Sequence, residues 1–385
     1  MAEPSITAQS LTPDAVRSAY ALIQPYVHRT PLLTCQTLNN IASTPQSAES
    51  LVGTPFEGQT PANPKFRFFF KCENYQRIGA FKARGAFHAL LRLLAERGEE
   101  EVKRRGVITH SSGNHAQALA LAASTLHVPA YIVMPSISTP SKIAGTRSHG
   151  AEVIFSGSTS TEREAVVAEI QAKTDAILVP PYDHFDIICG QGTTALEMEE
   201  QYRALVTDKP HLSVHASGAE ADAGSRHLDA VITPVGGGGL NAGVATFFSD
   251  KPTRVFGAEP SFEGADDCRR GLEAGQRVES VKTLTIADGL RTPVGVLNWE
   301  IISDRSKVAG VFAVTEDQIK AAMRLVLERM KVVVEPSAVV GLAVCLFNEE
   351  FRRLAEKEAG PDGWDMGIVF SGGNTTVEAI GKLFA

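Results

Sequence analysis

Short β-branched or aromatic runs alternate along the chain with Ala- and Leu-rich segments, and this alternation constrains the fold more than any other feature. The strand-like runs include FRFFFKC (66–72), GVITH (106–110) and AYIVMP (130–135), and the helical segments between them include AFHALLRLLAERG and AQALALAASTL. This order is typical of βαβ units, so we expect an α/β fold with mostly parallel sheets flanked by helices. Because parallel α/β sheets bind ligands beyond the carboxyl ends of their strands, the loops at those ends should carry the chemistry.

Composition and charge narrow the class of partner. The 385-residue chain carries 37 basic and 44 acidic residues, mixed along its length, for a net charge of -7. We therefore expect no nucleic-acid partner, and a small molecule instead. The five cysteines form no CxxC pair, the N-terminus shows no signal-peptide pattern, and no run of about 18 apolar residues occurs. A soluble, cytoplasmic protein that enters no membrane is the prediction.

Three segments lie outside the alternating pattern. Thr12 as N-cap and Pro13 at the first helical position predict an opening helix over 12–27. The stretches 42–64 and 207–227 are rich in small and polar residues, so neither can build a core. We expect both to be surface insertions without a part in the chemistry.

The first loop with chemical potential is SSGNH (111–115), between GVITH and the next helical segment. Small polar residues at a helix start expose backbone N–H groups at the positive end of the helix dipole, which suits a carboxylate. An ordinary N-cap is the alternative for the Ser-Gly-Asn core alone. The serine doublet followed by Asn and His is richer than a cap requires, so the loop is a candidate substrate site.

The second loop consists of four glycines, Gly236 to Gly239, between DAVITPV and LNAGVATFF. Consecutive glycines let the backbone fold tightly around an anion and point N–H groups at it, which predicts a phosphate site. A Walker lysine is missing, whereas Glu259 lies 20 residues beyond Gly239, so a nicotinamide site stays open as a weaker alternative. A merely flexible loop fits its strand and helix neighbours less well.

Phe81 and Lys82 stand at the start of the helical segment that ends near Leu94. An isolated lysine is ordinarily a solvated surface residue. A lysine desolvated beside an aromatic ring loses its proton more readily and can form an imine with an aldehyde cofactor.

The fourth loop, SGGN (371–374), is by itself a common turn, and it matters only if it faces the same cleft.

Taken together, these loops resemble the fold type II pyridoxal-phosphate family, and within it the branch of serine racemases and serine or threonine dehydratases. The likeness runs from HRTPL to SGGN, outside the two polar stretches. It implies a tryptophan synthase β-like fold with a large domain (1–105 and 184–385) and a small, mobile domain (106–183). The segments that carry it are NYQRIGAFKARGA, THSSGNHAQALA, AGTRSHGAEV, GQGTTALE, PVGGGGL, AEPSFEGADD, TIADGL, ERMKVVVEPSA and SGGN.

The resemblance also implies roles for individual residues around pyridoxal 5'-phosphate. Lys82 would form the Schiff base and act as the base on one face of the substrate. A hydroxyl at the pyridine nitrogen leaves the ring a weaker electron sink than a carboxylate would, which suits β-elimination and racemisation. The other cofactor contacts would be Phe81 against the ring, Asn114 at the ring hydroxyl, Gly236, Gly237, Gly238 and Gly239 around the phosphate, and Ser371 at the pyridine nitrogen.

Ser112 distinguishes the two activities of this branch. Racemases resemble this chain in carrying serine there, on the face opposite the lysine, whereas simple dehydratases often carry alanine. Racemisation needs a base on each face, because one removes the α-proton and the other returns it. Substrate contacts by the same resemblance are Ser111, Ser112, Asn114 and His115 for the α-carboxylate, and Arg163 and Thr292 for the side chain.

The segment AEPSFEGADD resembles the divalent-cation site of racemases. Glu259 and Asp267 would supply carboxylates and Ala265 a backbone carbonyl to Mg²⁺, Ca²⁺ or Mn²⁺. A solvated acidic loop is the alternative, and Phe262 and Glu263 make this copy longer than the usual pattern.

The function hypothesis is a serine racemase and L-serine or L-threonine ammonia-lyase that acts on a small β-hydroxy amino acid, in a homodimer. One alternative is a pure ammonia-lyase for threonine or 3-hydroxyaspartate, in which Ser112 only binds carboxylate. Another is a non-catalytic binding protein on this scaffold, and a dehydrogenase is the most distant one.

Overall fold

The computed structural model describes residues 10–111, 113–138, 140–157, 160–215 and 226–385, which form two separate β-sheets. The larger sheet has six strands, and only its edge strand β1 runs antiparallel to its neighbour β2. Mostly parallel strands covered by helices confirm the predicted α/β class. In spatial order the strands are β1 (Leu32–Leu33), β2 (Phe66–Cys72), β10 (Trp364–Phe370), β7 (Ala230–Pro234), β8 (Arg254–Pro260) and β9 (Gly310–Val314).

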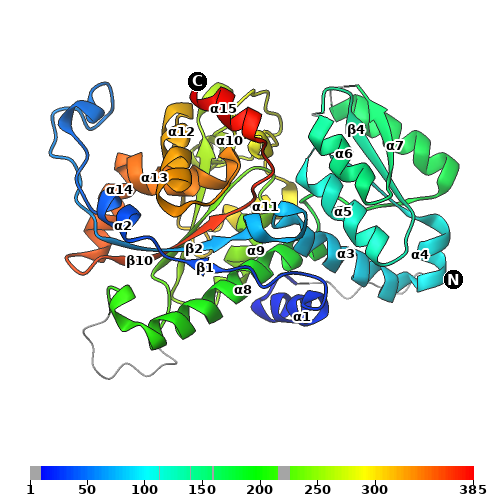
Figure 1. Ribbon diagram of the computed structural model, residues 1–385, viewed down its shortest axis with the longest axis horizontal. Helices are drawn as coiled ribbons and strands as arrows, with labels where there is room; N and C mark the ends of the chain where they lie inside the picture. Colours follow the sequence, from blue (N-terminus) through cyan, green and yellow to red (C-terminus); the bar gives the residue numbers. More distant parts are fainter. Residues whose placement is uncertain (1–9, 112, 139, 158–159, 216–225) are drawn as a thin grey trace.

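The smaller sheet is formed entirely from the chain between residues 107 and 178. Its four strands are parallel, in the order β5 (Glu152–Ser156), β4 (Ala130–Pro135), β3 (Val107–His110) and β6 (Ile177–Leu178). Figure 1 shows β4 with α5 (Asn114–Thr125), α6 (Pro140–Ser148) and α7 (Ser160–Thr174) at one end of the molecule, away from the labelled strands of the large sheet.

Side-chain alternation along the strands gives each sheet two covered faces. In β2, Phe66, Phe68 and Phe70 enter the core beneath α12 (Glu316–Leu325) and α13 (Val340–Phe347), while Phe69 enters the core on the opposite face. That opposite face is covered by α1 (Pro13–Ile23), α8 (Phe185–Asp208) and α9 (Gly239–Phe248). This follows from the period of two in a strand, which sends successive side chains to opposite faces.

The opening helix has the predicted start and ends earlier than predicted. The Thr12 hydroxyl accepts a hydrogen bond from the Ala15 amide, and Pro13 occupies the first turn. The helix ends at Ile23, ahead of residue 27. The remaining α-helices are α2 (Gln36–Ala42), α3 (Lys82–Arg97), α4 (Glu99–Arg105), α10 (Asp267–Ala274), α11 (Val296–Ile302), α14 (Glu349–Ala359) and α15 (Val377–Phe384), and no helix among the described residues is long and apolar enough to cross a membrane.

The described residues of the two polar stretches lie mostly on the surface of the large-sheet part, and buried charged residues hold them in place. Segment 42–64 projects from the end of the molecule far from the small sheet (Figure 1). The buried Arg352 guanidinium donates to the carbonyls of Ala42, Thr44 and Ala62, so the segment has a fixed base. In the second stretch, the Ser213 hydroxyl donates to the buried Asp365 carboxylate, and residues 216–225 lie outside the described residues.

Candidate active site

Lys82 is the first residue of α3, and its amine points into the protein. Nζ donates to the Pro181 carbonyl over 2.8 Å and lies 5.2 Å from the centre of the Phe81 ring. Burial lowers the pKa of the Lys82 amine to about 8, because the charged form loses its hydration. No ion pair joins Lys82 to a carboxylate in the described part of the chain. The amine therefore becomes neutral, and nucleophilic, far more readily than a surface lysine does.

The four glycines form a tightly enclosed turn at the start of α9. Gly238 has a φ of +92°, which favours glycine, and a Cβ on Gly237 would lie 2.5 Å from the Tyr182 ring. A Cβ on Gly236 would lie 3.0 Å from the Gly289 carbonyl oxygen. Since Tyr182 follows Pro181, one short segment contacts both the glycine turn and the Lys82 amine.

A polar support that sequence reasoning missed holds this turn in place. The Asn298 amide donates to the Gly237 carbonyl over 2.7 Å and to the Tyr182 carbonyl over 3.3 Å. The Asp183 carboxylate accepts hydrogen bonds from the Val296 and Leu297 amides at the start of α11. Both residues lie far in sequence from the glycines, so only the fold reveals the connection.

The SGGN loop lies directly beside the segment that carries Lys82. The Phe81 amide donates to the Ser371 carbonyl over 3.0 Å, and Gly372 forms a β-bridge with Ala80. Ser371 is buried at the carboxyl end of β10. The fourth predicted loop therefore does face the same region as the lysine.

Asn114, at the start of α5, reaches the same region from the small sheet. Its Nδ2 donates to Glu335 Oε1 over 2.8 Å, and its Oδ1 accepts from Asn374 Nδ2 over 2.8 Å. Burial and the nearby Asp288 raise the pKa of the Glu335 carboxyl to about 7. Glu335 and Asn374 stood in segments that the sequence marked, yet their contacts with Asn114 span more than 200 residues.

The substrate loop is described on both sides of Ser112, which itself lies outside the described residues. The Gly113 amide donates to the Ser111 hydroxyl over 3.3 Å. Burial, together with the Lys82 charge, lowers the pKa of His115 to about 3, so its imidazole is neutral. A Cβ on Gly113 would lie 3.8 Å from Lys142 Nζ, which places another amine, missed by sequence reasoning, beside this loop.

A cavity of about 290 Å³ opens beside Pro181 and Tyr182 between the two sheets. His110 and Glu164 line it from the small-sheet side, and Arg277 and Pro293 from the other. Burial lowers the pKa of His110, and the Arg163 charge lowers it further. Arg163 thus stands near this cavity, and Thr292 immediately precedes one of its lining residues.

Two of the three predicted metal ligands, Glu259 and Asp267, lie close enough for their charges to interact. Glu259 is fully buried at the end of β8, and its carboxylate accepts from the Cys268 and Arg269 amides at 3.0 and 2.9 Å. Burial, and then the Asp267 charge, raises the pKa of Glu259 well above its usual range; burial also raises that of Asp267 to about 6. The extra residues form a short turn at Phe262–Gly264, and Ala265, which follows it, is buried.

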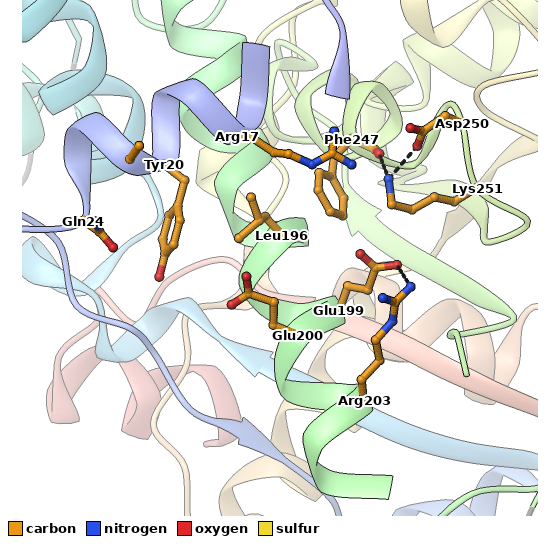
Figure 2. Close-up of a pocket in the computed structure, with 11 residues that line it drawn as sticks. Arg17, Tyr20, Gln24, Leu196, Glu199, Glu200, Arg203, Phe247, Asp250 and Lys251 are labelled. Carbon is orange, nitrogen blue, oxygen red and sulfur yellow. Dashed lines mark hydrogen bonds and ion pairs between the residues drawn. The ribbon is translucent and has the colours of Figure 1, made fainter. Parts of the chain in front are cut away.

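A larger pocket of about 570 Å³ lies elsewhere, between α1, α8 and the end of α9 (Figure 2). Its charged side chains are largely paired with one another: Arg203 with Glu199 at 2.9 Å, and Lys251 with Asp250 at 2.5 Å. None of the residues that form the candidate active site lines it. Size alone therefore does not identify the site in this molecule.

Comparison with known proteins identifies the family. Residues 53–372 match the family described as "Pyridoxal-phosphate dependent enzyme". The chain belongs to this family of enzymes. It is 38% identical over 372 residues to the "Serine racemase" of Arabidopsis thaliana, which covers 96% of this chain and 95% of that protein. These matches confirm the fold type II class and the resemblance drawn from the motifs.

Solved structures agree with this assignment. The maize serine racemase structure superposes with a TM-score of 0.77 at 34% identity, and the match covers 97% of this chain and 96% of that chain. The structure of a threonine deaminase from T.th. gives a TM-score of 0.73 at 34% identity, covering 95% and 99%.

The residues present fit the family's cofactor. A buried amine with a lowered pKa suits an aldehyde, and an enclosed glycine turn at a helix N-terminus suits a phosphate. The Pro181–Tyr182 segment brings these two features together.

Proposed function

We propose that this pyridoxal-phosphate-dependent enzyme racemises serine and also eliminates ammonia from L-serine or L-threonine. The observation that carries the proposal is the Lys82 amine in a chain related to serine racemases. Burial lowers its pKa, it lies beside the glycine turn, and no carboxylate among the described residues pairs with it. When bound, the cofactor withdraws electrons from the substrate's α-carbon and makes its proton acidic. The protein then has to supply bases at the correct positions.

In this proposal Lys82 holds the cofactor and takes the α-proton on one face, and Ser112 exchanges a proton on the other. The N–H groups at the start of α5 bind the substrate α-carboxylate, a role that Lys142 beside Gly113 supports electrostatically. The remaining proposed contacts are Phe81 against the ring, Asn114 at its hydroxyl, Gly236, Gly237, Gly238 and Gly239 at the phosphate, Ser371 at the pyridine nitrogen, and Ser111, Asn114 and His115 around the carboxylate.

The substrate side chain would point toward the cavity near Arg163 and Thr292. The cavity has a volume of about 290 Å³ and opens to solvent, so it can accommodate a small β-hydroxy amino acid. We further propose that residues 106–183 form the small domain and close over the substrate. The Lys142–Asp288 ion pair and the Asn114–Glu335 hydrogen bond cross between the two parts and support such closure.

Glu259, Asp267 and the Ala265 carbonyl are proposed to bind Mg²⁺, or Ca²⁺ or Mn²⁺ in its place. Burial raises the pKa of both carboxyls, and the Asp267 charge raises that of Glu259 further, so a divalent cation would stabilise both as carboxylates. A homodimer and a cytoplasmic location complete the proposal. The five cysteines, all unpaired in the structure, agree with a reducing compartment.

The test is an incubation of purified protein with L-serine, D-serine, L-threonine and the 3-hydroxyaspartates, with and without Mg²⁺. We expect D-serine and pyruvate to form together from L-serine, and added Mg²⁺ to raise both rates. Oxo acid without any D-serine would favour the second candidate, a pure ammonia-lyase, to which the threonine deaminase structure gives support.

Ser112→Ala separates the two candidates further. If Ser112 is the second base, racemisation falls by about 100-fold or more while elimination continues, because only racemisation needs a base on both faces. Ser111→Ala is the comparison variant: it removes a hydroxyl that the proposal places at the substrate carboxylate, so both reactions should fall together. Equal losses of both reactions in Ser112→Ala would contradict the two-base role.

A further inference from the structure

Three loops from distant parts of the chain meet in one directed chain of hydrogen bonds around Asn114. Asn374 Nδ2 donates to the Ile78 carbonyl over 2.8 Å and to Asn114 Oδ1 over 2.8 Å. Asn114 Nδ2 in turn donates to Glu335 Oε1 over 2.8 Å. Gly79 makes room for this arrangement, because a Cβ there would lie 2.8 Å from Asn374 Oδ1.

The direction of this chain is fixed at its first member. A backbone carbonyl can only accept, so Asn374 must turn its NH₂ group toward Ile78 and, with the same group, toward Asn114. Asn114 must then present its oxygen to Asn374 and its NH₂ group to Glu335. One hydrogen of that NH₂ group is used by Glu335, and the second remains available as a donor.

We propose that Asn374 and Glu335 are positioning residues that fix the polarity of the Asn114 amide, so that Asn114 offers the cofactor's ring oxygen a donor. The proposal rests on the role of Asn114 given under the proposed function and adds what determines that role. A fixed donor stabilises the ionised ring oxygen relative to the neutral hydroxyl. The hydrogen-bond chain therefore sets the protonation state of the bound cofactor.

The surroundings of Glu335 make this control depend on pH. Glu335 is 3% exposed, and burial and the Asp288 charge both raise the pKa of its carboxyl. The Lys142 charge and hydrogen bonds from the Asn114 side chain and the Asn374 backbone N–H act in the opposite direction. Its pKa is raised to about 7, so the carboxylate forms as the pH rises through that value. An ionised carboxylate is the stronger acceptor for Asn114, so the amide is held more firmly above pH 7 than below it.

Asn374→Asp tests the proposal, because a carboxylate can donate neither to the Ile78 carbonyl nor to Asn114. The readout is the ratio of the two absorption bands of bound pyridoxal phosphate that report the ionised and the neutral ring oxygen. We expect this ratio to fall about tenfold, and the cofactor dissociation constant to rise by a similar factor. Asn374→Ala, which adds no charge, should shift the ratio in the same direction by a smaller factor.

Asn74→Asp is the matched control for the added charge. Asn74 lies against Gly373 of the same loop and donates to the Val333 carbonyl, outside the hydrogen-bond chain. Its band ratio should stay near that of the wild-type protein. Glu335→Gln keeps an acceptor for Asn114, so its spectrum should resemble the wild type while the change of the ratio near pH 7 disappears.

The outcomes separate this inference from the function it rests on. A wild-type protein without cofactor bands would overturn the proposed function. A wild-type protein with both bands, and Asn374 variants whose ratios equal that of Asn74→Asp, would overturn the role of the hydrogen-bond chain alone. If Asn374→Asp fails to fold, Asn374→Ala and Glu335→Gln decide the question.

Discussion

Lys82 and Arg84 lie two residues apart at the start of α3, and the protein buries their charges in opposite ways. The fully buried Arg84 guanidinium pairs with Glu73 at 2.8 Å and with Glu197 at 2.7 Å. Lys71 adds a second cation at 2.7 Å from Glu197. Within the described part of the chain, the Lys82 amine donates to the Pro181 carbonyl and pairs with no carboxylate. One cation is therefore neutralised by acids, and the other is not.

The pKa shifts follow from this difference. The two carboxylates raise the pKa of Arg84 despite its burial, so its charge is permanent. Burial without a counter-charge lowers the pKa of Lys82 to about 8. The paired cluster connects β2, α3 and α8 and so fixes the helix, while the unpaired amine at the same helix start remains available for chemistry. A buried lysine with no acid beside it is thus a stronger pointer to catalysis than the more conspicuous ion cluster.

The largest expected effect is on activity, in Lys82→Ala. Removal of the amine eliminates the cofactor attachment and one of the two bases, so racemisation and elimination should fall by about 1000-fold or more. Stability of the apoprotein should change little, because no ion pair is broken. Lys103→Ala, which removes an exposed lysine paired with Glu99, serves as control for both assays. Activity of Lys82→Ala within tenfold of the wild type would show that the Lys82 amine is not required for the chemistry.

Arg84→Met should have the opposite profile, a large loss of stability. It leaves Glu73 and Glu197 buried beside a reduced cationic charge, which costs about 3–5 kcal/mol in the free energy of unfolding. Denaturant unfolding of the apoprotein measures this loss. Lys173→Met breaks an exposed ion pair with Glu169 and should cost at most about 1 kcal/mol. Equal losses of stability in the two variants would show that the buried cluster stabilises the fold no more than an exposed ion pair does.

Gly237→Ala tests whether the glycine turn beside Lys82 supports cofactor binding. The new Cβ would lie 2.5 Å from the Tyr182 ring, so the segment that receives the Lys82 hydrogen bond must move. We expect cofactor affinity to fall by roughly tenfold, which corresponds to about 1.4 kcal/mol. Gly381→Ala, in α15 with no heavy atom within 4 Å of its Cβ position, should leave affinity unchanged. Fluorescence titration of apoprotein with pyridoxal phosphate distinguishes these results.

The smallest effect expected is a pH dependence of cofactor capture. Only the neutral amine attacks an aldehyde, so the rate of capture by apoprotein should rise with pH and level off above about 8, the lowered pKa of Lys82. With an ordinary lysine the rate would continue to rise up to the usual lysine pKa of 10.5. Stopped-flow absorbance over this pH range measures the rate. A rate still rising steeply at pH 10 would show that burial does not lower the pKa.

The fold was largely predictable because its strands carry a strong local signal. FRFFFKC and AYIVMP coincide with β2 and β4 residue for residue. The strand β9 (Gly310–Val314) was not anticipated, although its Val and Phe residues are typical of strands. The two-residue strand β1 was not anticipated either, since its residues form a strand by pairing with β2. Short edge strands of this kind depend on tertiary neighbours more than on their own pattern.

The candidate site was predictable as a set of loops but not as a set of contacts. Lys82 and the glycine turn were visible because their residue types are unusual at a helix start. Glu335 and Asn298 were not assigned roles, because an acid or an amide in a loop has no distinctive local pattern. Their importance arises from partners 221 and 61 residues away, Asn114 and Gly237, which only the folded chain brings within hydrogen-bonding distance.

The most direct test of the central claim is to reduce the purified protein, loaded with pyridoxal phosphate, with borohydride and to map the modified peptide by mass spectrometry. Reduction converts the carbon–nitrogen double bond between cofactor and lysine into a stable secondary amine. We expect one phosphopyridoxyl group, on Lys82, and none on Lys71 or Lys142. Modification of another lysine in the wild-type protein, or a chain that binds the cofactor without covalent attachment, would contradict it.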